Sequence, residues 1–523
     1  MNTTPRGAPA EIPVHLDRVA GTPLPVQLAA ALREAIDAAT LRSGEQVPAT
    51  RQLASRLGVA RGVVVAAYEQ LIAEGYLRAE HGRGTLVNPD LEGLRASGVA
   101  GLRPGRGGEN DGTSALGGSE AAGSRAVSGG GSARPTLPAD DGVADPEPAP
   151  RAPLAPGTPL TDAIERPAWR AAWRSALARA DRPSPPLGDA RLRREIAEHL
   201  RLTRGTARPA ADVIVTAGAR EGLGLLLTAL GAARGSGPVV GVEDPGYPSL
   251  RSAAARYGAR IVPLPVDADG LQTGALPSGV LDAVIVTPSH QYPVGGSLPL
   301  PRRRELLAWA ARTGVIVVED DYDSELRHIG SPLPALAALD DPRSGAVVTL
   351  GTFSSTITPA LAAGFLLAPE NLRALLESVR RDLGSPVSSV VQLALGDYLA
   401  SGELRRNIAR MRRRHAARRD LISERFAGVP GARVRPMSGG LHAVIELAGP
   451  ADRARDREAD AVARAAVPDA RFPSGLGAAA LGTYWQHHRA GRTAGLVLGM
   501  GGPDDAEFAA AVERLRAILA SAR

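Results

Sequence analysis

Residues 315–325 read VIVVEDDYDSE, a short apolar run that ends abruptly in acidic side chains and a tyrosine. Four more runs have the same form: VIVTAG at 213–218, VVGVEDPGY at 239–247, AVIVTPSHQYPVGG at 283–296 and AVVTLGTFSS at 346–355. Such runs are typical of strands buried on both faces, and helix-like segments separate them here. Over residues 152–523 the pattern predicts a large α/β domain with a mostly parallel sheet.

The polar tails of these runs predict a ligand site. In an open parallel sheet, ligands bind beyond the carboxyl ends of the strands. One tail is weak evidence, but five successive tails carry tyrosines, acids, hydroxyls or an Arg-Glu pair. We therefore expect them to converge on one pocket.

The segment 13–88 has its own apolar periodicity and predicts a separate small α+β domain. We expect helices over 24–38 and 50–57, the second closed by Gly58, and a third that begins at Arg61. Its apolar face is predicted to comprise Val64, Ala67, Tyr68, Leu71 and Ile72. Only a short turn separates the helix that ends at residue 57 from the one that begins at Arg61. An arginine at the start of the second helix in such a pair is typical of a recognition helix in the major groove. The stretch GYLRAEHGRGTLV then predicts two strands joined by a basic wing.

Between the two domains, residues 89–151 are dominated by Gly, Ser, Ala and Pro and predict a disordered linker. A flexible linker of this length has an r.m.s. span on the order of 40–45 Å. That span is long enough to reach across a dimer or between operator half-sites.

Composition narrows the function classes. All 61 basic side chains are arginine, so the chain contains no lysine. The absence of cysteine excludes disulfides, thiolate metal sites and a cysteine nucleophile, and no metal site is expected. A net charge of +6 permits a polyanionic partner. With no long apolar stretch and no signal-peptide layout, we expect a cytoplasmic protein without membrane contact.

The small domain carries spaced motifs: Val47-Pro48-Ala49-Thr50-Arg51, Leu57-Gly58-Val59-Ala60-Arg61, Ala67-Tyr68 and Glu74-Gly75-Tyr76-Leu77. They resemble the winged helix-turn-helix domain of the GntR family of transcription regulators. The resemblance implies that double-stranded operator DNA is the partner. It places the DNA contacts on Arg51, Arg61, Gly62, Val63, Val65 and the wing residues His81, Gly82 and Arg83. Ala60 and Val63 stand where the family usually has hydroxyl side chains, so a helix cap and a phosphate contact are missing.

The order of strands and tails resembles the fold-type-I aminotransferase domain, and the two domains together resemble a MocR-type regulator. That family binds pyridoxal 5′-phosphate (PLP). The resemblance implies that Asp320 faces the ring nitrogen and Tyr322 the phenolic oxygen. It also implies that Tyr247 covers the ring and that Thr352 lies near the phosphate.

The segment that should hold PLP covalently departs from the family. Where the family has Gly-Thr-Phe-Ser-Lys and a later phosphate-binding arginine, this chain has GTFSSTITPALAAGF at 351–365. Ser355 stands at the lysine and Ala362 at the arginine. We therefore expect no Schiff base, no catalytic residue and no transaminase activity. Asp320 then needs either a new cationic partner, for which Arg220 is the candidate, or a pocket open to water.

The sequence favours a transcription regulator whose aminotransferase-like domain forms a homodimer and senses an unknown small-molecule effector. Two alternatives stay open: a PLP-binding enzyme with an appended DNA-binding domain, and a dimerisation module that ignores ligands. The arginine-rich run 405–419 is a further ambiguity. Its narrow apolar stripe of Leu404, Ile408 and Met411 favours a solvated helix that supports a dimer or domain contact over more DNA surface.

Overall fold

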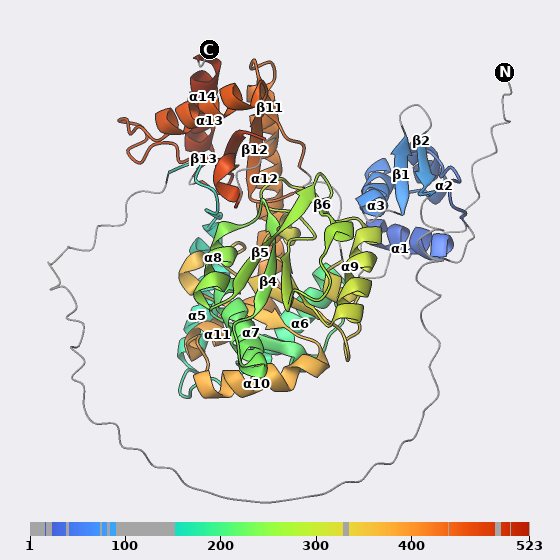
Figure 1. Ribbon diagram of the computed structural model, residues 1–523, viewed down its shortest axis with the longest axis vertical. Coiled ribbons are helices and arrows are strands. Elements are labelled where there is room, and N and C mark those ends of the chain that lie inside the picture. The colour runs from blue at the N-terminus through green and yellow to red at the C-terminus, as the bar shows by residue number, and fades with distance from the viewer. Residues whose placement is uncertain are drawn as a thin grey trace, which may run out of the picture.

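The computed structural model describes residues 16, 24–37, 41–73, 76–80, 84–89, 152–327, 334–437, 439–486, 493–502 and 504–521. Over these ranges the strands form sheets of two, eight and four strands. Figure 1 shows the first in the small N-terminal unit in blue, the second in a layered central body, and the third in the C-terminal unit in red. The predicted linker falls outside these ranges except for Pro89.

In its described residues, the N-terminal unit has three helices followed by a pair of strands: α1 (Leu24–Asp37), α2 (Thr50–Leu57), α3 (Arg61–Ala73), β1 (Leu77–Glu80) and β2 (Gly84–Val87). Gly58 ends α2 in the left-handed conformation, with φ 60°, and its amide donates to the carbonyls of Ala54 and Ser55. Glycine adopts this conformation without a Cβ clash, which is why the chain turns here. The predicted helix over 50–57 is confirmed.

The apolar face of α3 is narrower than expected. Val64, Ala67, Tyr68 and Leu71 are buried in the core of the unit, but Ile72 is 36% exposed, so its placement on the buried face was wrong. Ile72 lies about 80° around the helix from Val64, at the edge of the stripe. Tyr68 completes the core with a polar contact, because its hydroxyl donates to the Pro48 carbonyl at 2.7 Å.

Replacing Tyr68 with phenylalanine is expected to loosen this unit. The change leaves the Pro48 carbonyl without its buried donor, which costs about 1–3 kcal/mol. Hydrogen–deuterium exchange of the full chain should show faster exchange in α3. Tyr257→Phe is the control, because that side chain is 47% exposed; equal exchange in both variants would contradict the assignment.

The central sheet has the order β3-β10-β9-β8-β7-β4-β5-β6. Strands β9, β8, β7, β4 and β5 are parallel, and β10 runs antiparallel to both β3 and β9. The strands are β3 (Val213–Thr216), β4 (Val239–Asp244), β5 (Arg260–Asp267), β6 (Gly270–Leu271), β7 (Ala283–Val286), β8 (Ile316–Asp320), β9 (Val347–Thr352) and β10 (Gly364–Leu367). The predicted mostly parallel sheet is confirmed, and all five quoted runs are strands whose carboxyl ends share one edge.

Helices cover both faces of this sheet. They are α5 (Pro167–Leu177), α6 (Ala190–Arg204), α7 (Ala219–Arg234), α8 (Pro248–Arg256), α9 (Leu300–Thr313), α10 (Glu370–Leu383) and α11 (Ser389–Ala400). Val284 and Val286 of β7 pack in one core with Leu306 of α9. Ile285, between them, packs in the opposite core with Leu226 of α7. This alternation explains why the strand is apolar at every position.

The C-terminal unit is an antiparallel sheet, ordered β11-β12-β14-β13, with helices against it. Its elements are α12 (Glu403–Phe426), β11 (Ala432–Val434), β12 (His442–Leu447), α13 (Ala451–Ala465), β13 (Ala479–Ala480), β14 (Gly495–Gly499) and α14 (Asp505–Ser521). Among the described helices, none combines the length and the apolar composition needed to cross a bilayer.

The arginine-rich run lies on α12, and several of its side chains are used inside the domain. Arg418 is 3% exposed and donates to the carbonyls of Met500 and Gly502. Arg412 donates to the carbonyl of Arg327. The predicted stripe of Leu404, Ile408 and Met411 is buried in the main core. These contacts favour the domain-contact interpretation of the run over a DNA surface.

The N-terminal unit contacts the central body through α9. The Arg304 guanidinium donates to the Tyr76 hydroxyl at 3.1 Å and lies 5.9 Å from the centre of the Tyr76 ring. Leu300, at the start of α9, is buried in the core of the N-terminal unit. Figure 1 shows the unit beside α9. Because α9 follows the loop after β7, this contact links the N-terminal unit to the edge of the sheet where the tails meet.

Candidate functional site

A cavity of about 270 Å³ lies at the carboxyl edge of the central sheet. Every one of the five strand tails contributes to its wall. The lining includes Ala217, Gly218, Ala219 and Arg220 after β3, Tyr247 after β4, Tyr292 after β7, Asp320 and Tyr322 at the end of β8, and Thr352, Ser354 and Ser355 at the end of β9. The predicted convergence of the tails on one pocket is therefore confirmed.

Asp320 is the acidic group of this cavity. Its side chain is 4% exposed. Four carboxylates around it have partners: Asp321 pairs with Arg204, Asp323 with His290, Glu243 accepts from Thr287, and Glu319 accepts from the Leu336 amide. Within the described part of the chain, no hydrogen bond or ion pair reaches the Asp320 carboxylate.

The pKa of Asp320 lies well above its usual value. Burial is the main cause, and repulsion by Asp321, Asp323, Glu243 and Glu319 adds to it. A cation brought against Asp320 would reverse this effect, because an opposite charge at close range favours the ionised carboxylate.

Tyrosine rings form one wall of the cavity. Tyr292 stands edge-on to Tyr247, with ring centres 5.2 Å apart, and to Tyr322 at 5.7 Å. Tyr247 is 40% exposed, so its ring is accessible from outside. The Tyr322 hydroxyl donates to the His290 carbonyl at 3.1 Å and is thus engaged within the protein.

Two small residues line the cavity where the family has its Schiff-base lysine and its phosphate-binding arginine. Ser355 is 8% exposed, and Ala362 is exposed with φ 43°. The Thr352 hydroxyl accepts a hydrogen bond from the Ser354 amide at 3.1 Å. No lysine amine is available for a covalent bond with PLP, because the chain has no lysine. The pocket therefore fits PLP at Asp320 and Tyr247 but does not fit its covalent attachment.

Arg220 lies in the first turn of α7, exposed, at the same cavity. The suggested pairing with Asp320 is not found, since no ion pair joins the two side chains over the described ranges. Asp320 instead lines the cavity, and the alternative of a pocket open to water stays a prediction. His442, which also lines the cavity, has its pKa lowered to about 4 by burial and by His290, so the imidazole is neutral.

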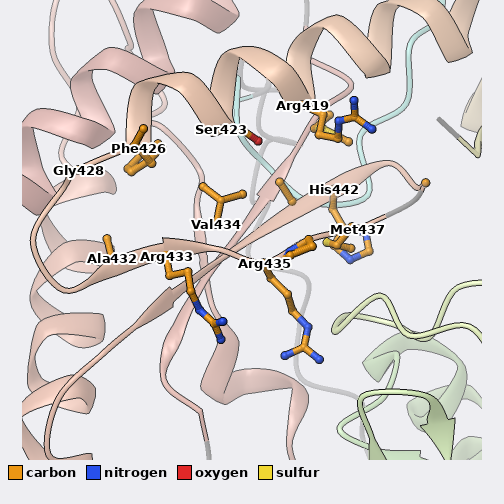
Figure 2. A pocket seen from close by; sticks show the side chains of 15 residues that line it. Arg419, Ser423, Phe426, Gly428, Ala432, Arg433, Val434, Arg435, Met437 and His442 are labelled. Atoms are coloured by element: carbon orange, nitrogen blue, oxygen red, sulfur yellow. The ribbon is translucent and has the colours of Figure 1, made fainter. Parts of the chain in front are cut away.

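A second cavity, of about 490 Å³, lies between α12 and β11 (Figure 2). In Figure 2, Val434 points toward the helix, and Arg433 and Arg435 point to the other side of the strand. Both arginines pair with Glu446. Their charges are balanced within the protein, so this cavity is a weaker candidate for a charged ligand.

Three buried side chains, His290, Asp323 and His442, bring metal-ligating atoms within 4.8 Å of one another. His290 Nδ1 lies 2.9 Å from the Asp323 carboxylate, and His442 Nε2 lies 2.8 Å from the Pro293 carbonyl. The group could hold a divalent cation through imidazole and carboxylate ligands. One member of this group, His290, also accepts a hydrogen bond from the Tyr322 hydroxyl through its carbonyl oxygen. The group therefore helps to hold Tyr322 in place.

The surface expected to bind DNA is formed by the starts of α2 and α3. Arg51, Arg61 and Gly62 are exposed, whereas Val63 and Val65 are partly buried. The Arg61 side chain reaches back to the Thr50 hydroxyl at 3.5 Å. The remaining predicted contacts, His81, Gly82 and Arg83, lie outside the described residues.

Sequence reasoning assigned no role to Tyr292 and His442, two residues of the pocket that carry rings. Tyr292 was part of the quoted tail after β7 but had no assigned role, and its aromatic ring was the signal that could have identified it. His442 comes from β12, far along the chain, and carried no local signal.

Comparisons with known proteins assign both parts of the chain. Residues 24–87 match the family described as bacterial regulatory proteins, gntR family, and residues 154–466 match aminotransferase class I and II. The fold resembles the kynurenine aminotransferase of Pyrococcus horikoshii, with a TM-score of 0.58 and 21% identity, over 70% of this chain and 90% of that one. At this identity the likeness shows the fold alone.

Two regulators are similar over most of their length. The chain is 41% identical over 497 residues to the HTH-type pyridoxine biosynthesis transcriptional regulator PdxR of Corynebacterium glutamicum, covering 95% of this chain and 96% of that one. It is 34% identical over 417 residues to the probable rhizopine catabolism regulatory protein MocR of Rhizobium meliloti, covering 78% of each. The chain therefore belongs to the GntR family of transcription regulators, in the MocR-type group that joins a helix-turn-helix domain to an aminotransferase-like domain.

Proposed function

We propose that this regulator binds operator DNA through α3 and uses the cavity of its aminotransferase-like domain to sense a small molecule without covalent chemistry. One combination of observations carries the proposal. The start of α3 is exposed, and the same chain has a cavity that keeps Asp320 and its tyrosines but has no lysine. Asp320 and the tyrosine wall remain, and the group that transamination requires does not. Transaminase activity is not part of the proposed function.

The contact at α9 supports coupling between the two sites. Tyr292 lines the cavity, the loop that carries it leads into α9, and Arg304 of α9 bonds to Tyr76 in the N-terminal unit. A ligand changes DNA affinity only if it binds two arrangements of these parts unequally. Movement of the loop on ligand binding would alter the α9 contact.

We further propose that the protein acts as a homodimer, as the MocR-type group implies. Dimeric helix-turn-helix proteins read two half-sites spaced by about 34–36 Å or multiples of it. A dimer would therefore require two copies of the recognition sequence in each operator. Selection from a library of random duplexes with the full-length protein tests this, because a monomer would enrich single half-sites.

Replacing Arg61 with alanine is expected to remove operator discrimination. A bidentate contact of arginine with guanine contributes about 1–3 kcal/mol against the wrong base, which is about 5- to 150-fold in affinity. Binding to unrelated DNA at low salt should persist, because attraction to phosphate does not depend on sequence. Gel-shift competition between the selected operator and scrambled DNA measures the ratio.

Arg182→Ala is the matched control, since it removes one exposed positive charge from the central body. It should leave the operator preference unchanged. Equal preference in the Arg61 variant and the parent protein would show that Arg61 does not read the operator.

A further inference from the structure

Three buried side chains from the central and C-terminal parts of the fold lie together. His290 is in the loop after β7, Asp323 follows β8, and His442 is the first residue of β12. Each is at most 4% exposed, and each offers a metal-ligating atom within 4.8 Å of the other two. Two segments of the central body and one strand of the C-terminal sheet are therefore joined at one point.

Each histidine of this group has one ring nitrogen with a partner and one without. Nδ1 of His290 lies 2.9 Å from the Asp323 carboxylate, and Nε2 of His442 lies 2.8 Å from the Pro293 carbonyl. Both oxygens are acceptors, so these nitrogens carry the protons of the neutral imidazoles. The lone pairs then lie on Nε2 of His290 and Nδ1 of His442. Among the described residues, neither of these two buried atoms has a hydrogen-bond partner.

Metal-binding histidines have this pattern of partners. One ring nitrogen of such a histidine faces the metal, and the other donates its N–H to a carboxylate or a backbone carbonyl, which fixes the orientation of the ring. His290 has the carboxylate partner and His442 has the carbonyl partner. A buried polar atom is costly without a partner, and a metal ion would supply one to a lone pair.

Two imidazoles and one carboxylate favour zinc over magnesium or calcium. Zinc accepts nitrogen as well as oxygen ligands, whereas the two harder cations depend on oxygen. The surroundings are acidic, because Asp323 adds to the rise that burial causes in the pKa of Asp320. Arg327 lines a small cavity together with His290 and Asp323 and offsets part of this negative charge. A cation held by charge alone is therefore disfavoured.

The spacing of the three side chains requires only a small closure around an ion. In a tetrahedral zinc site with bonds of about 2.0–2.1 Å, the ligand atoms lie about 3.3 Å apart. Here the corresponding atoms lie within 4.8 Å of one another. Gly440, with φ 101°, permits the close approach, because a Cβ there would collide with Cε1 of His290 and lie 2.9 Å from Oδ2 of Asp323.

We infer that His290, Asp323 and His442 form a binding site for one zinc ion per chain. His442 binds through Nδ1, and Asp323 either binds the ion itself or orients His290 so that its Nε2 does. The ion fixes β12 against the segments that follow β7 and β8. The sequence predicted no metal site because the chain lacks cysteine, but none of these ligands is a cysteine. The inference does not depend on the proposed sensing.

Cobalt and zinc titrations of the full-length protein test the inference. The protein is dialysed against EDTA until metal analysis finds no zinc, and cobalt(II) is then added while visible absorption is recorded. We expect one equivalent of cobalt to give the d–d bands of a tetrahedral site and zinc to remove them. Magnesium should not compete. No such bands, or displacement by magnesium as readily as by zinc, would overturn the inference.

Three substitutions assign the ligands. Loss of an outer partner of a metal ligand weakens binding by about 10–100-fold, so His290→Gln and His442→Gln should each weaken zinc binding by at least about 100-fold. Asp323→Asn should have an effect of that size if the carboxylate binds the ion, and one of about 10–100-fold if it orients His290. Circular dichroism verifies folding. Folded variants that keep the parent affinity would overturn the inference.

Two further measurements keep the test decisive. If a histidine variant fails to fold, the cobalt spectrum of the parent protein and the Asp323→Asn variant decide. Zinc should also raise the urea concentration at which the parent protein unfolds, because it binds the folded state. The same shift in all three folded site variants would overturn the inference.

A second pair of histidines provides the control for adventitious binding. His487 and His488 are adjacent in the sequence and lie outside the described residues. Their joint replacement, His487→Gln with His488→Gln, should leave the cobalt spectrum and the zinc affinity unchanged. Loss of both in this control would mean an adventitious ion only and would overturn the inference.

Discussion

Replacing Ser355 with lysine and Ala362 with arginine is expected to give a protein that holds PLP covalently at residue 355. Both positions line the same cavity as Asp320 and Tyr247, so the restored amine and guanidinium would join the parts that remain. Ser355 is 8% exposed, and burial lowers the pKa of a lysine amine, which makes it a better nucleophile. Ala362 already has φ 43°, so an arginine there adds no new backbone strain.

The measurement is incubation with PLP, reduction with borohydride, and peptide mass spectrometry. An adduct at residue 355 is expected in the double variant, whereas the parent protein has no lysine that could form one. Ser354→Lys with Ala362→Arg is the matched control, because Ser354 lines the same cavity one residue earlier. Absence of the adduct at 355, or an equal yield in the control, would mean that the pocket no longer directs this chemistry.

Replacing Arg204 with methionine should cost about 3–5 kcal/mol of unfolding free energy, since it leaves a buried charge without its partner. The Arg204 side chain is 0% exposed, donates to Asp321 at 2.9 Å and to the Ser289 hydroxyl at 2.9 Å. Burial raises the pKa of Glu319, and the charge of Arg204 opposes that rise; the same charge, with that of His199, helps to hold the pKa of Glu325 below its usual value against burial. Without Arg204, several acids around Asp320 would lose their balancing cation.

Urea unfolding followed by tryptophan fluorescence measures this loss, because Trp309 is buried in the central core. Arg201→Met is the control, one turn earlier on α6, where the arginine is exposed and pairs with Glu198 on the surface. The control should unfold at nearly the parent urea concentration. If both variants unfold together, the pairing with Asp321 does not stabilise the fold.

Much of the architecture could be predicted because the relevant signals are local. The helix-turn-helix depends on apolar spacing and on a glycine that turns the chain at position 58. The parallel sheet depends on short apolar runs that end in polar tails. The burial of Ile72 could not be predicted, because periodicity does not locate the edge of a buried stripe.

The role of the arginine-rich helix α12 could not be predicted from its sequence either. Its composition left a DNA surface and a domain contact open. Packing decided between them, because Arg418 donates to carbonyls of Met500 and Gly502, more than 80 residues further along the chain. No local pattern records which distant backbone oxygens a side chain will reach.

The sequence by itself determined that this chain cannot bond PLP through a lysine, because the absence of a residue type does not depend on the fold. It also determined the helix-turn-helix and the strand tails that meet at one edge. Only the tertiary structure decided how the charges are distributed there. Among the described residues Asp320 has no hydrogen-bond or ion-pair partner, Arg220 lines the same cavity without pairing with it, and His442 comes from a different sheet. The distances between such groups depend on the packing of segments that are remote in the chain, and that packing determines what the pocket can bind.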